Sequence, residues 1–144
     1  MCTGDHTACQ VLSWFFYTLF LPHAALAQGA VQPHPVMEVQ LGQRATLTCF
    51  TTMDEVFYFL WYKQPFGQKP QLMARAYGDS EEGQFQGEFK GVTRFSAKRS
   101  KKRFNLTISN VEVSDAAAYF CATEFLDEIT FGDGTFLVLT GRYY

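Results

Sequence analysis

Two cysteines on either side of a tryptophan are the residues of this chain whose chemistry is clearest. Trp61 lies 12 residues after Cys49, and Cys121 lies 72 residues after Cys49. Tyr119 stands two positions before the second cysteine. This spacing is expected where one disulfide joins two face-to-face β-sheets, an indole packs against the sulfurs and a tyrosine hydroxyl fixes a corner. Such a sandwich presents loops and catalyses nothing by itself, so the pattern predicts a recognition module.

Catalytic residues are scarce in the rest of the chain. His34 is the only histidine after residue 27, and it lies between two prolines. A Ser-His-Asp triad or a metal cluster needs several convergent side chains, which the sequence does not offer. We therefore expect a protein that is not an enzyme and needs no metal or cofactor.

Length and composition are those of one folded domain. The chain has 144 residues, of which 47% are hydrophobic, including 15 Phe, so it can bury a sizeable core. A net charge of −2 gives no reason to expect a nucleic-acid partner.

The first 27 residues are interpreted as a cleaved secretory signal. Residues 11–21 form an apolar run of 11 residues, too short to span a bilayer, and Ala25-Leu26-Ala27 is a small-x-small cleavage pattern. Cleavage removes Cys2 and Cys9 and leaves one pair of cysteines for an oxidising compartment. No apolar segment of membrane-spanning length follows, so we expect a secreted chain, or a cell-surface protein if a membrane segment is missing from this sequence.

Short runs of alternating polarity predict an all-β fold. The predicted strands are residues 45–49, 59–64, 72–77, 104–108, 118–121 and 135–139. Pro33 and Pro35 predict a kinked edge strand at the start of the mature chain. Gly132 and Gly134 predict a bulge that projects Phe131 away from the last strand.

Several short segments together resemble an immunoglobulin variable-type (V-set) domain, an all-β, two-sheet Greek-key sandwich with one inter-sheet disulfide. The segments are Leu47-Thr48-Cys49, Trp61-Tyr62-Lys63-Gln64, Arg94-Phe95-Ser96, Leu106-Thr107-Ile108, Asp115-Ala116-Ala117-Ala118-Tyr119-Phe120-Cys121 and Phe131-Gly132-Asp133-Gly134-Thr135. The resemblance implies a V-set domain over residues 28–140, followed by a short tail, 141–144. The final segment is similar to the joining segment of antigen receptors.

Further segments are most similar to the novel immune-type receptors of bony fish. They are Gln32-Pro33-His34-Pro35-Val36, Gly67-Gln68-Lys69-Pro70 and Glu88-Phe89-Lys90. A T-cell receptor alpha or delta variable region, which recognises peptide-MHC or a similar ligand, is the alternative. Either resemblance implies immune recognition of a protein partner at the cell surface. A homophilic adhesion module and a soluble decoy receptor are the remaining alternatives.

The V-set topology gathers three loops at one end of the sandwich, about residues 51–58, 77–84 and 123–130. These loops hold eight acidic residues and no Lys or Arg. The acids are Asp54, Glu55, Asp79, Glu81, Glu82, Glu124, Asp127 and Glu128. The negative charge of these loops favours a partner with a basic surface. The alternative interpretation is that these loops are charged only because exposed loops are generally polar.

Two features qualify this prediction. A basic turn is expected at the rim of the same end, and the alternative reading of its residues is a solvated turn. It contains Lys98, Arg99, Lys101, Lys102 and Arg103. Phe125, Leu126 and Ile129 in the third loop either anchor a partner or fold onto the loop base.

Strand alternation assigns a second surface, which we call the pairing face. It consists of Tyr62, Gln64, Pro70, Leu72, Phe120 and Phe131. An exposed apolar patch on a sheet marks an association site, and the resemblance implies pairing with a second V domain through this sheet. We therefore expect a homodimer or a heterodimer.

Three further residues have predicted roles. Asn105-Leu106-Thr107 is a glycosylation sequon, and Asn105 faces away from the core because its neighbours face inward. Arg94 and Asp115 resemble the pair that closes the end of V domains opposite the loops, a role in folding rather than binding.

Overall fold

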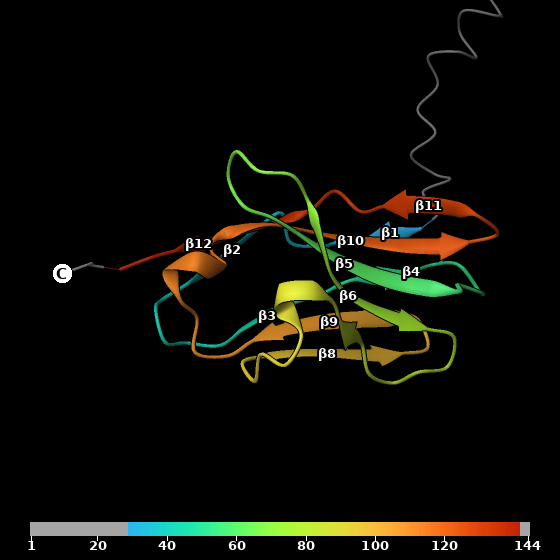
Figure 1. Cartoon of the computed structure of the whole chain (residues 1–144). Helices are drawn as coiled ribbons and strands as arrows, with labels where there is room; N and C mark the ends of the chain where they lie inside the picture. The colour runs from blue at the N-terminus through green and yellow to red at the C-terminus, as the bar shows by residue number, and fades with distance from the viewer. Residues whose placement is uncertain (1–28, 142–144) are drawn as a thin grey trace, which may run out of the picture.

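The computed structural model describes residues 29–141 as two β-sheets packed face to face (Figure 1). The five-stranded sheet has the order β1-β4-β9-β3, with β8 also paired to β9. Its strands are β1 (Ala30–Val31), β3 (Ala45–Leu47), β4 (Phe50–Thr51), β8 (Phe95–Ser100) and β9 (Arg103–Ile108).

The seven-stranded sheet has the order β2-β12-β10-β5-β6-β7, with β11 also paired to β10. Its strands are β2 (Val36–Val39), β5 (Tyr58–Gln64), β6 (Gln71–Tyr77), β7 (Gln84–Phe85), β10 (Ala117–Phe125), β11 (Glu128–Phe131) and β12 (Thr135–Leu139). Two short 3-10 helices, η2 (Gly87–Phe89) and η3 (Val113–Asp115), connect strands. All the described pairings are antiparallel except that of β2 with β12, which is parallel.

The disulfide predicted from spacing is present between the two sheets. The Cα atoms of Cys49 and Cys121 are 6.2 Å apart. Trp61 is completely buried in the same core, and its indole nitrogen donates a hydrogen bond of 3.1 Å to the carbonyl oxygen of Phe104. The Tyr119 hydroxyl donates a bond of 2.6 Å to the carbonyl oxygen of Asp115, which is the predicted corner. The all-β, two-sheet prediction is confirmed.

The chain changes sheets near its first described residues. β1 pairs with β4 in one sheet, and β2 pairs with β12 in the other. Pro33 and Pro35 lie between them, where no ladder hydrogen bond is needed from their nitrogens. The predicted kinked edge strand is therefore split into two short strands on opposite sheets.

Two predicted boundaries were wrong. The basic turn is narrower than predicted, because Lys98 and Arg99 belong to β8 and Arg103 begins β9. Most of the third loop is a β-hairpin, since β10 continues to Phe125 and β11 begins at Glu128. In both cases strand pairing extends beyond the segments whose polarity alternates clearly.

Other predictions lie partly outside the described residues. The signal peptide (1–27), with Cys2 and Cys9, is outside them, as are the last three residues of the tail. Within residues 29–141, no helix is long and apolar enough to cross a membrane.

Candidate functional site

The loops predicted to bind a partner meet at one end of the sandwich, at the right of Figure 1. Hydrogen bonds between backbones join the loops directly. The Phe57 nitrogen of the first loop donates to the carbonyl oxygen of Glu124 at 2.8 Å, and the Gly78 nitrogen of the second loop donates to that of Phe57 at 2.8 Å. The rings of Phe57 and Phe125 also lie 5.1 Å apart. The three loops therefore form one continuous surface.

The third loop narrows to a two-residue turn. Leu126 and Asp127 connect β10 to β11 with φ angles of 49° and 62°. Two positive φ angles are typical of a type I′ hairpin turn, which favours Asn and Gly because other side chains are strained there. Leu126 is nevertheless 68% exposed, and Ile129 is 47% exposed. Phe125 folds against the first loop, whereas Leu126 and Ile129 face solvent.

A groove of about 930 Å³ lies between the first two loops and the turn joining β8 to β9. Arg99 lines it and is largely buried. Its guanidinium donates to the carbonyl oxygens of Ala76 at 3.0 Å and Val56 at 3.3 Å, and it stacks 5.1 Å from the ring centre of Phe59. Burial lowers the pKa of Arg99, and nearby Asp79 partly offsets the effect.

Arg99 is a loop-organising residue that sequence reasoning missed. The sequence pattern places it in the basic turn, but it continues the inward alternation of Ala97 in β8, opposite the buried Phe104 of β9. That alternation was the available signal. Its buried cation joins the backbone of the first loop to the end of β6.

Basic residues neutralise part of the acidic loop end. Lys98 forms an ion pair with Glu82, whose pKa is lowered by that hydrogen bond, and Lys102 forms one with Asp54 at 3.3 Å. Within residues 29–141, no ion pair involves the acids of the third loop, which are Glu124, Asp127 and Glu128. The predicted rim position of the basic turn is therefore confirmed. Six of the eight loop acids, three of them on the hairpin, form no ion pair within residues 29–141.

The pairing face is assembled on the outer side of the seven-stranded sheet. Tyr62 stands opposite both Phe120 and Leu72, and its ring lies 5.4 Å from that of Phe131. Burial raises the pKa of Tyr62, and Glu124 adds to the effect. Phe131 remains 53% exposed.

The margins of this face differ in detail from the prediction. Pro70 is exposed just before β6, and the Gln64 amide donates to the carbonyl oxygen of Gln68 in its own turn at 3.1 Å. Two apolar residues missed by sequence reasoning extend the face, because Phe136 stands opposite Ala118 and is 58% exposed, and Val36 opposite Phe136 is 53% exposed.

A buried glutamine explains the glycines that follow Phe131. The Gln32 side chain donates to the Tyr119 carbonyl oxygen at 2.9 Å and accepts from the nitrogens of Cys121 at 3.0 Å and Gly134 at 2.9 Å. A Cβ at Gly132 would come within 2.6 Å of the Gln32 amide oxygen. Gly134 has φ of 94°, and a Cβ there would come within 2.7 Å of the Phe120 ring.

The bulge predicted at these glycines is present. Tyr119 pairs with Thr135, whereas Ala122 pairs with Phe131, so the last strand contains one extra residue between the two pairs. Gln32 was not recognised from the sequence, since nothing in its local pattern distinguishes it from an exposed edge residue.

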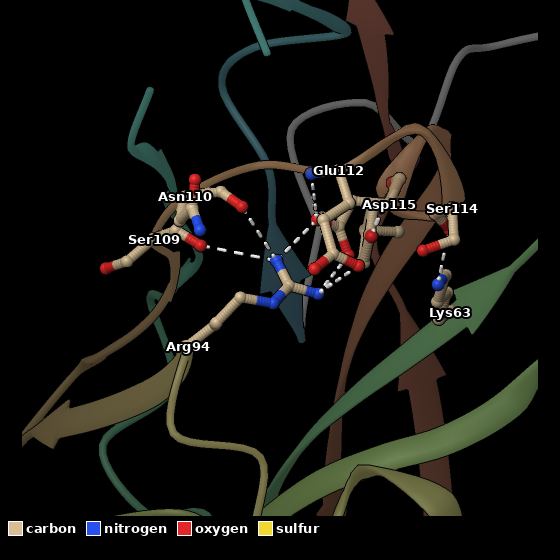
Figure 2. A network of polar contacts seen from close by, with 8 residues as sticks. Lys63, Arg94, Ser109, Asn110, Glu112, Ser114 and Asp115 are labelled. Atoms are coloured by element: carbon tan, nitrogen blue, oxygen red, sulfur yellow. Dashed lines mark hydrogen bonds and ion pairs between the residues drawn. The ribbon is translucent and has the colours of Figure 1, made fainter. Parts of the chain in front are cut away.

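The end opposite the loops is closed by a polar network (Figure 2). Arg94 donates to the Asp115 carboxylate at 2.7 Å and lies 3.4 Å from Glu112. The Asp115 side chain is 1% exposed and also accepts from the Glu112 nitrogen at 2.7 Å. Its hydrogen bond to Arg94 raises the pKa of the guanidinium. The predicted Arg94–Asp115 pair is confirmed.

Lys63 joins the same network from β5. Its ammonium donates to the carbonyl oxygen of Ser114 at 2.8 Å, and Figure 2 shows it pointing toward η3. Burial lowers the pKa of Lys63, and the carboxylates of Asp115 and Glu88 partly offset this. Asn105 lies on β9 in the five-stranded sheet, away from the pairing face. Within residues 29–141, no group of His, Cys, Asp or Glu is arranged to hold a metal ion.

The fold and the loop end define a variable-type sandwich, a scaffold that presents loops. The model of the immunoglobulin V-set domain matches residues 31–140, and the chain belongs to that family. This family is not enzymatic, which confirms the prediction that the chain is not an enzyme. A disulfide-bonded domain of this family belongs to the secretory pathway or the extracellular space.

Known variable regions are similar to this chain. The human T cell receptor alpha variable 38-2/delta variable 8 is 30% identical over 116 residues, covering 80% of this chain and 97% of that protein. Ig kappa chain V region 120 of Oryctolagus cuniculus is 31% identical over 105 residues, covering 73% and 91%. The human T cell receptor alpha chain MC.7.G5 is 31% identical over 135 residues, covering 92% of this chain. The chain spans about half of that relative, 48%.

A solved structure supports the same fold. The marsupial T cell receptor superposes with a TM-score of 0.70 at 23% identity, covering 80% of this chain and 53% of that chain. The similarity to variable regions is consistent with immune recognition.

Proposed function

We propose that this chain is the ligand-recognition domain of an immune receptor and that it binds a protein partner through its three loops. The exposed, strained turn at Leu126 carries the proposal. A leucine at positive φ costs about 1–2 kcal/mol relative to ordinary backbone, and such strain clusters at functional sites. Leu126 gains no burial in return, because it is 68% exposed. An apolar tip that is strained and unburied is suited to insertion into a partner's pocket.

The charges around this tip indicate a basic partner surface. Asp127 and Glu128 directly follow Leu126 on the exposed hairpin and have no ion-pair partner within residues 29–141. Complementary charge raises the association rate and fixes the orientation of a complex. The proposed epitope is therefore an apolar pocket with a basic rim.

Cell staining with multimers of the domain tests this proposal. We expect wild-type multimers to stain a subset of leukocytes or infected target cells, with a signal that falls as salt rises. Leu126→Ser and Asp127→Lys should each abolish the staining. Glu38→Lys changes the same charge on an exposed residue of β2, away from the hairpin, and should leave it intact. Equal loss in all three variants would contradict recognition through the loops.

Pairing with a second V domain through the pairing face is a second part of the proposal. The supporting observation is the contiguous apolar surface of Tyr62, Leu72, Phe120 and Phe131, since patches of this kind mark association sites. Sedimentation of the purified domain should show a dimer, or a mixed dimer with a co-expressed V domain. Phe131→Ser should shift the equilibrium to monomer, whereas Val113→Ser, at a more exposed apolar residue on η3, should not. A wild-type chain that stays monomeric at high concentration, both alone and with the co-expressed V domain, contradicts pairing.

The kind of receptor is the finest level of the proposal. The joining-like segment and the framework resemblance favour a novel immune-type receptor at the cell surface. A T cell receptor alpha or delta variable region is the second candidate, because two similar human proteins carry that name. The exon layout separates them: a joining-like segment in the same exon as the V framework supports the first, and a separately rearranged segment supports the second.

A further inference from the structure

The outer faces of the two sheets differ sharply in polarity. The outer side of the seven-stranded sheet carries the apolar pairing face. The outer side of the five-stranded sheet is polar, because its outward positions alternate with buried Ala97, Phe104 and Leu106. Its outward residues on β3, β8 and β9 are Thr46, Ser96, Lys98, Ser100, Arg103, Asn105 and Thr107. Phe50 of β4 lies on the same side, where the Arg103 guanidinium stacks 5.9 Å from its ring centre. Only one of the two faces is therefore suited to permanent exposure to water.

Asn105 stands on this polar face, opposite Lys98 of β8. Its carbonyl oxygen Oδ1 is buried and accepts no hydrogen bond, and the residue as a whole is half-buried. An orphaned buried acceptor costs free energy, and Asn is unfavourable within strands. Asn105 therefore adds little to the stability of the fold.

The second residue of chemical importance is Thr107. Its hydroxyl lies two positions from Asn105 on the same strand and face, 3.3 Å from the hydroxyl of Thr46. Asn-x-Thr is the acceptor sequence for N-linked glycosylation in the secretory pathway. The disulfide between Cys49 and Cys121 places the folded domain in that pathway.

We propose that Asn105 carries an N-linked glycan, and that this glycan shields the five-stranded sheet so that association occurs only through the opposite sheet. A bond forms between Asn105 Nδ2 and C1 of an oligosaccharide. The bond from C1 to the diphosphate of a lipid-linked donor breaks, the amide loses one proton and the lipid diphosphate leaves. The second clause of the proposal rests on the proposed pairing; the first does not.

The directions of the two faces support this shielding. Side chains on the outer faces of two packed sheets point in opposite directions, so a glycan on β9 extends away from Tyr62 and Phe131. A hydrated oligosaccharide covers neighbouring polar side chains, including Lys98 and Ser96, and prevents close approach of a second protein. The glycan therefore leaves the pairing face free.

Mass analysis of the full chain secreted from eukaryotic cells tests the modification. We expect a mass above that of the polypeptide, and release with an amidase in heavy-oxygen water should label position 105. Asn105→Gln and Thr107→Ala should each remove the excess mass, and Thr107→Ser, which retains the sequon, should keep it. Two separate removals guard against one variant failing to fold. A secreted, folded wild-type chain without excess mass overturns the proposal.

A transplanted sequon tests the shielding. Phe136→Asn with Val138→Thr creates a sequon at two exposed positions of β12, on the outer side of the seven-stranded sheet. Combined with Asn105→Gln, it should weaken pairing by at least about tenfold, whereas Asn105→Gln alone should not. Pairing that survives the transplanted glycan would overturn shielding. New association through the five-stranded sheet after loss of the native glycan would support it. A glycan on Asn105 in a wild-type chain that stays monomeric, both alone and with a co-expressed V domain, would refute pairing and leave the modification confirmed.

Discussion

At the scale of single residues, Asp115 lies at the centre of the polar network that closes the end opposite the loops. Its buried carboxylate receives a guanidinium and a backbone nitrogen, and its carbonyl oxygen receives the Tyr119 hydroxyl. One residue therefore fixes β8, η3 and β10 with respect to one another. Its importance for folding follows from burial, because a buried carboxylate or its partner cannot be solvated once the pair is broken.

Removing this carboxylate should destabilise the domain strongly. Asp115→Ala leaves the Arg94 cation without its closest partner, and we expect a loss of about 3–5 kcal/mol in the free energy of unfolding. Glu112→Ala removes the more exposed carboxylate near the same cation and should cost less than about 1 kcal/mol. Urea unfolding followed by tryptophan fluorescence measures both. Similar losses in the two variants would show that burial does not set the contribution.

Alkaline pH provides a second test at this scale. Burial strongly raises the pKa of Tyr119, and the charge of Asp115 adds to this. The folded domain therefore keeps the phenol proton above pH 10, where the unfolded chain releases it. The contribution of Tyr119 to the free energy of unfolding is fully present below pH 10. Above pH 10 it should fall by about 1.4 kcal/mol per pH unit.

Tyr119→Phe should separate these effects. The variant loses about 1 kcal/mol at pH 7, because the hydrogen bond to the Asp115 carbonyl oxygen is absent. Above pH 10 its stability should decline less steeply than that of the wild type. Parallel pH profiles from chemical unfolding would rule out this origin of the alkaline sensitivity.

At the scale of elements, the loop end depends on contacts between loops. Arg99 of β8 reaches carbonyl oxygens in both the first loop and the end of β6. Arg99→Ala should leave these acceptors unpaired and cost about 1–3 kcal/mol. Hydrogen exchange should become faster at the amides of Phe57 and Gly78 and stay unchanged in β12. Arg103→Ala, an exposed arginine on β9, is the matched control.

At the hairpin turn we expect a substitution to stabilise the domain rather than destabilise it. Leu126→Asn places a residue that tolerates positive φ at a strained position, so the free energy of unfolding should rise by about 1 kcal/mol. The same variant removes the apolar tip, so ligand staining should decline. Thermal unfolding and staining measured on one preparation check both. A variant that is less stable than wild type would show that Leu126 contributes contacts absent from the described structure.

Predictions from the sequence were correct where polarity alternates along a strand. They were also correct where residue types such as cysteine and glycine have one characteristic geometric role. The cysteine pair, Trp61 and the bulge were predicted for these reasons. Predictions failed for Gln32 and Arg99, because their partners are backbone atoms of distant strands that no local pattern reveals. They also missed the length of β10, since Ala122 and Thr123 are both buried and interrupt the expected alternation.

At the scale of the whole molecule, the two ends and the two outer faces of the sandwich differ in structure and in expected role. One end holds the loops, the other holds the Arg94 network, one outer face is apolar and the other is polar. The disulfide between Cys49 and Cys121 connects the two layers across a sequence separation of 72 residues. Four different surfaces can therefore be altered separately, provided that the core between them remains intact.

Loss of the disulfide tests this dependence. Replacing both cysteines with alanine should lower the free energy of unfolding by about 4 kcal/mol, because the unfolded chain loses its cross-link. Chemical denaturation of the folded fraction measures the change, with the wild type under reducing conditions as a comparison. An unchanged midpoint would show that core packing alone holds the sheets together.

The bulge at Gly132 and Gly134 has a consequence for engineering. The Gln32 side chain accepts hydrogen bonds from the backbone nitrogens of Cys121 in β10 and Gly134 beside the bulge. The pairing of β10 with β11 begins just beyond these two residues. Hairpins of different length or sequence could thus be exchanged at residues 123–130 as replaceable cassettes, while the register of the remaining strands is preserved. The molecule contains a natural graft site for new binding specificities.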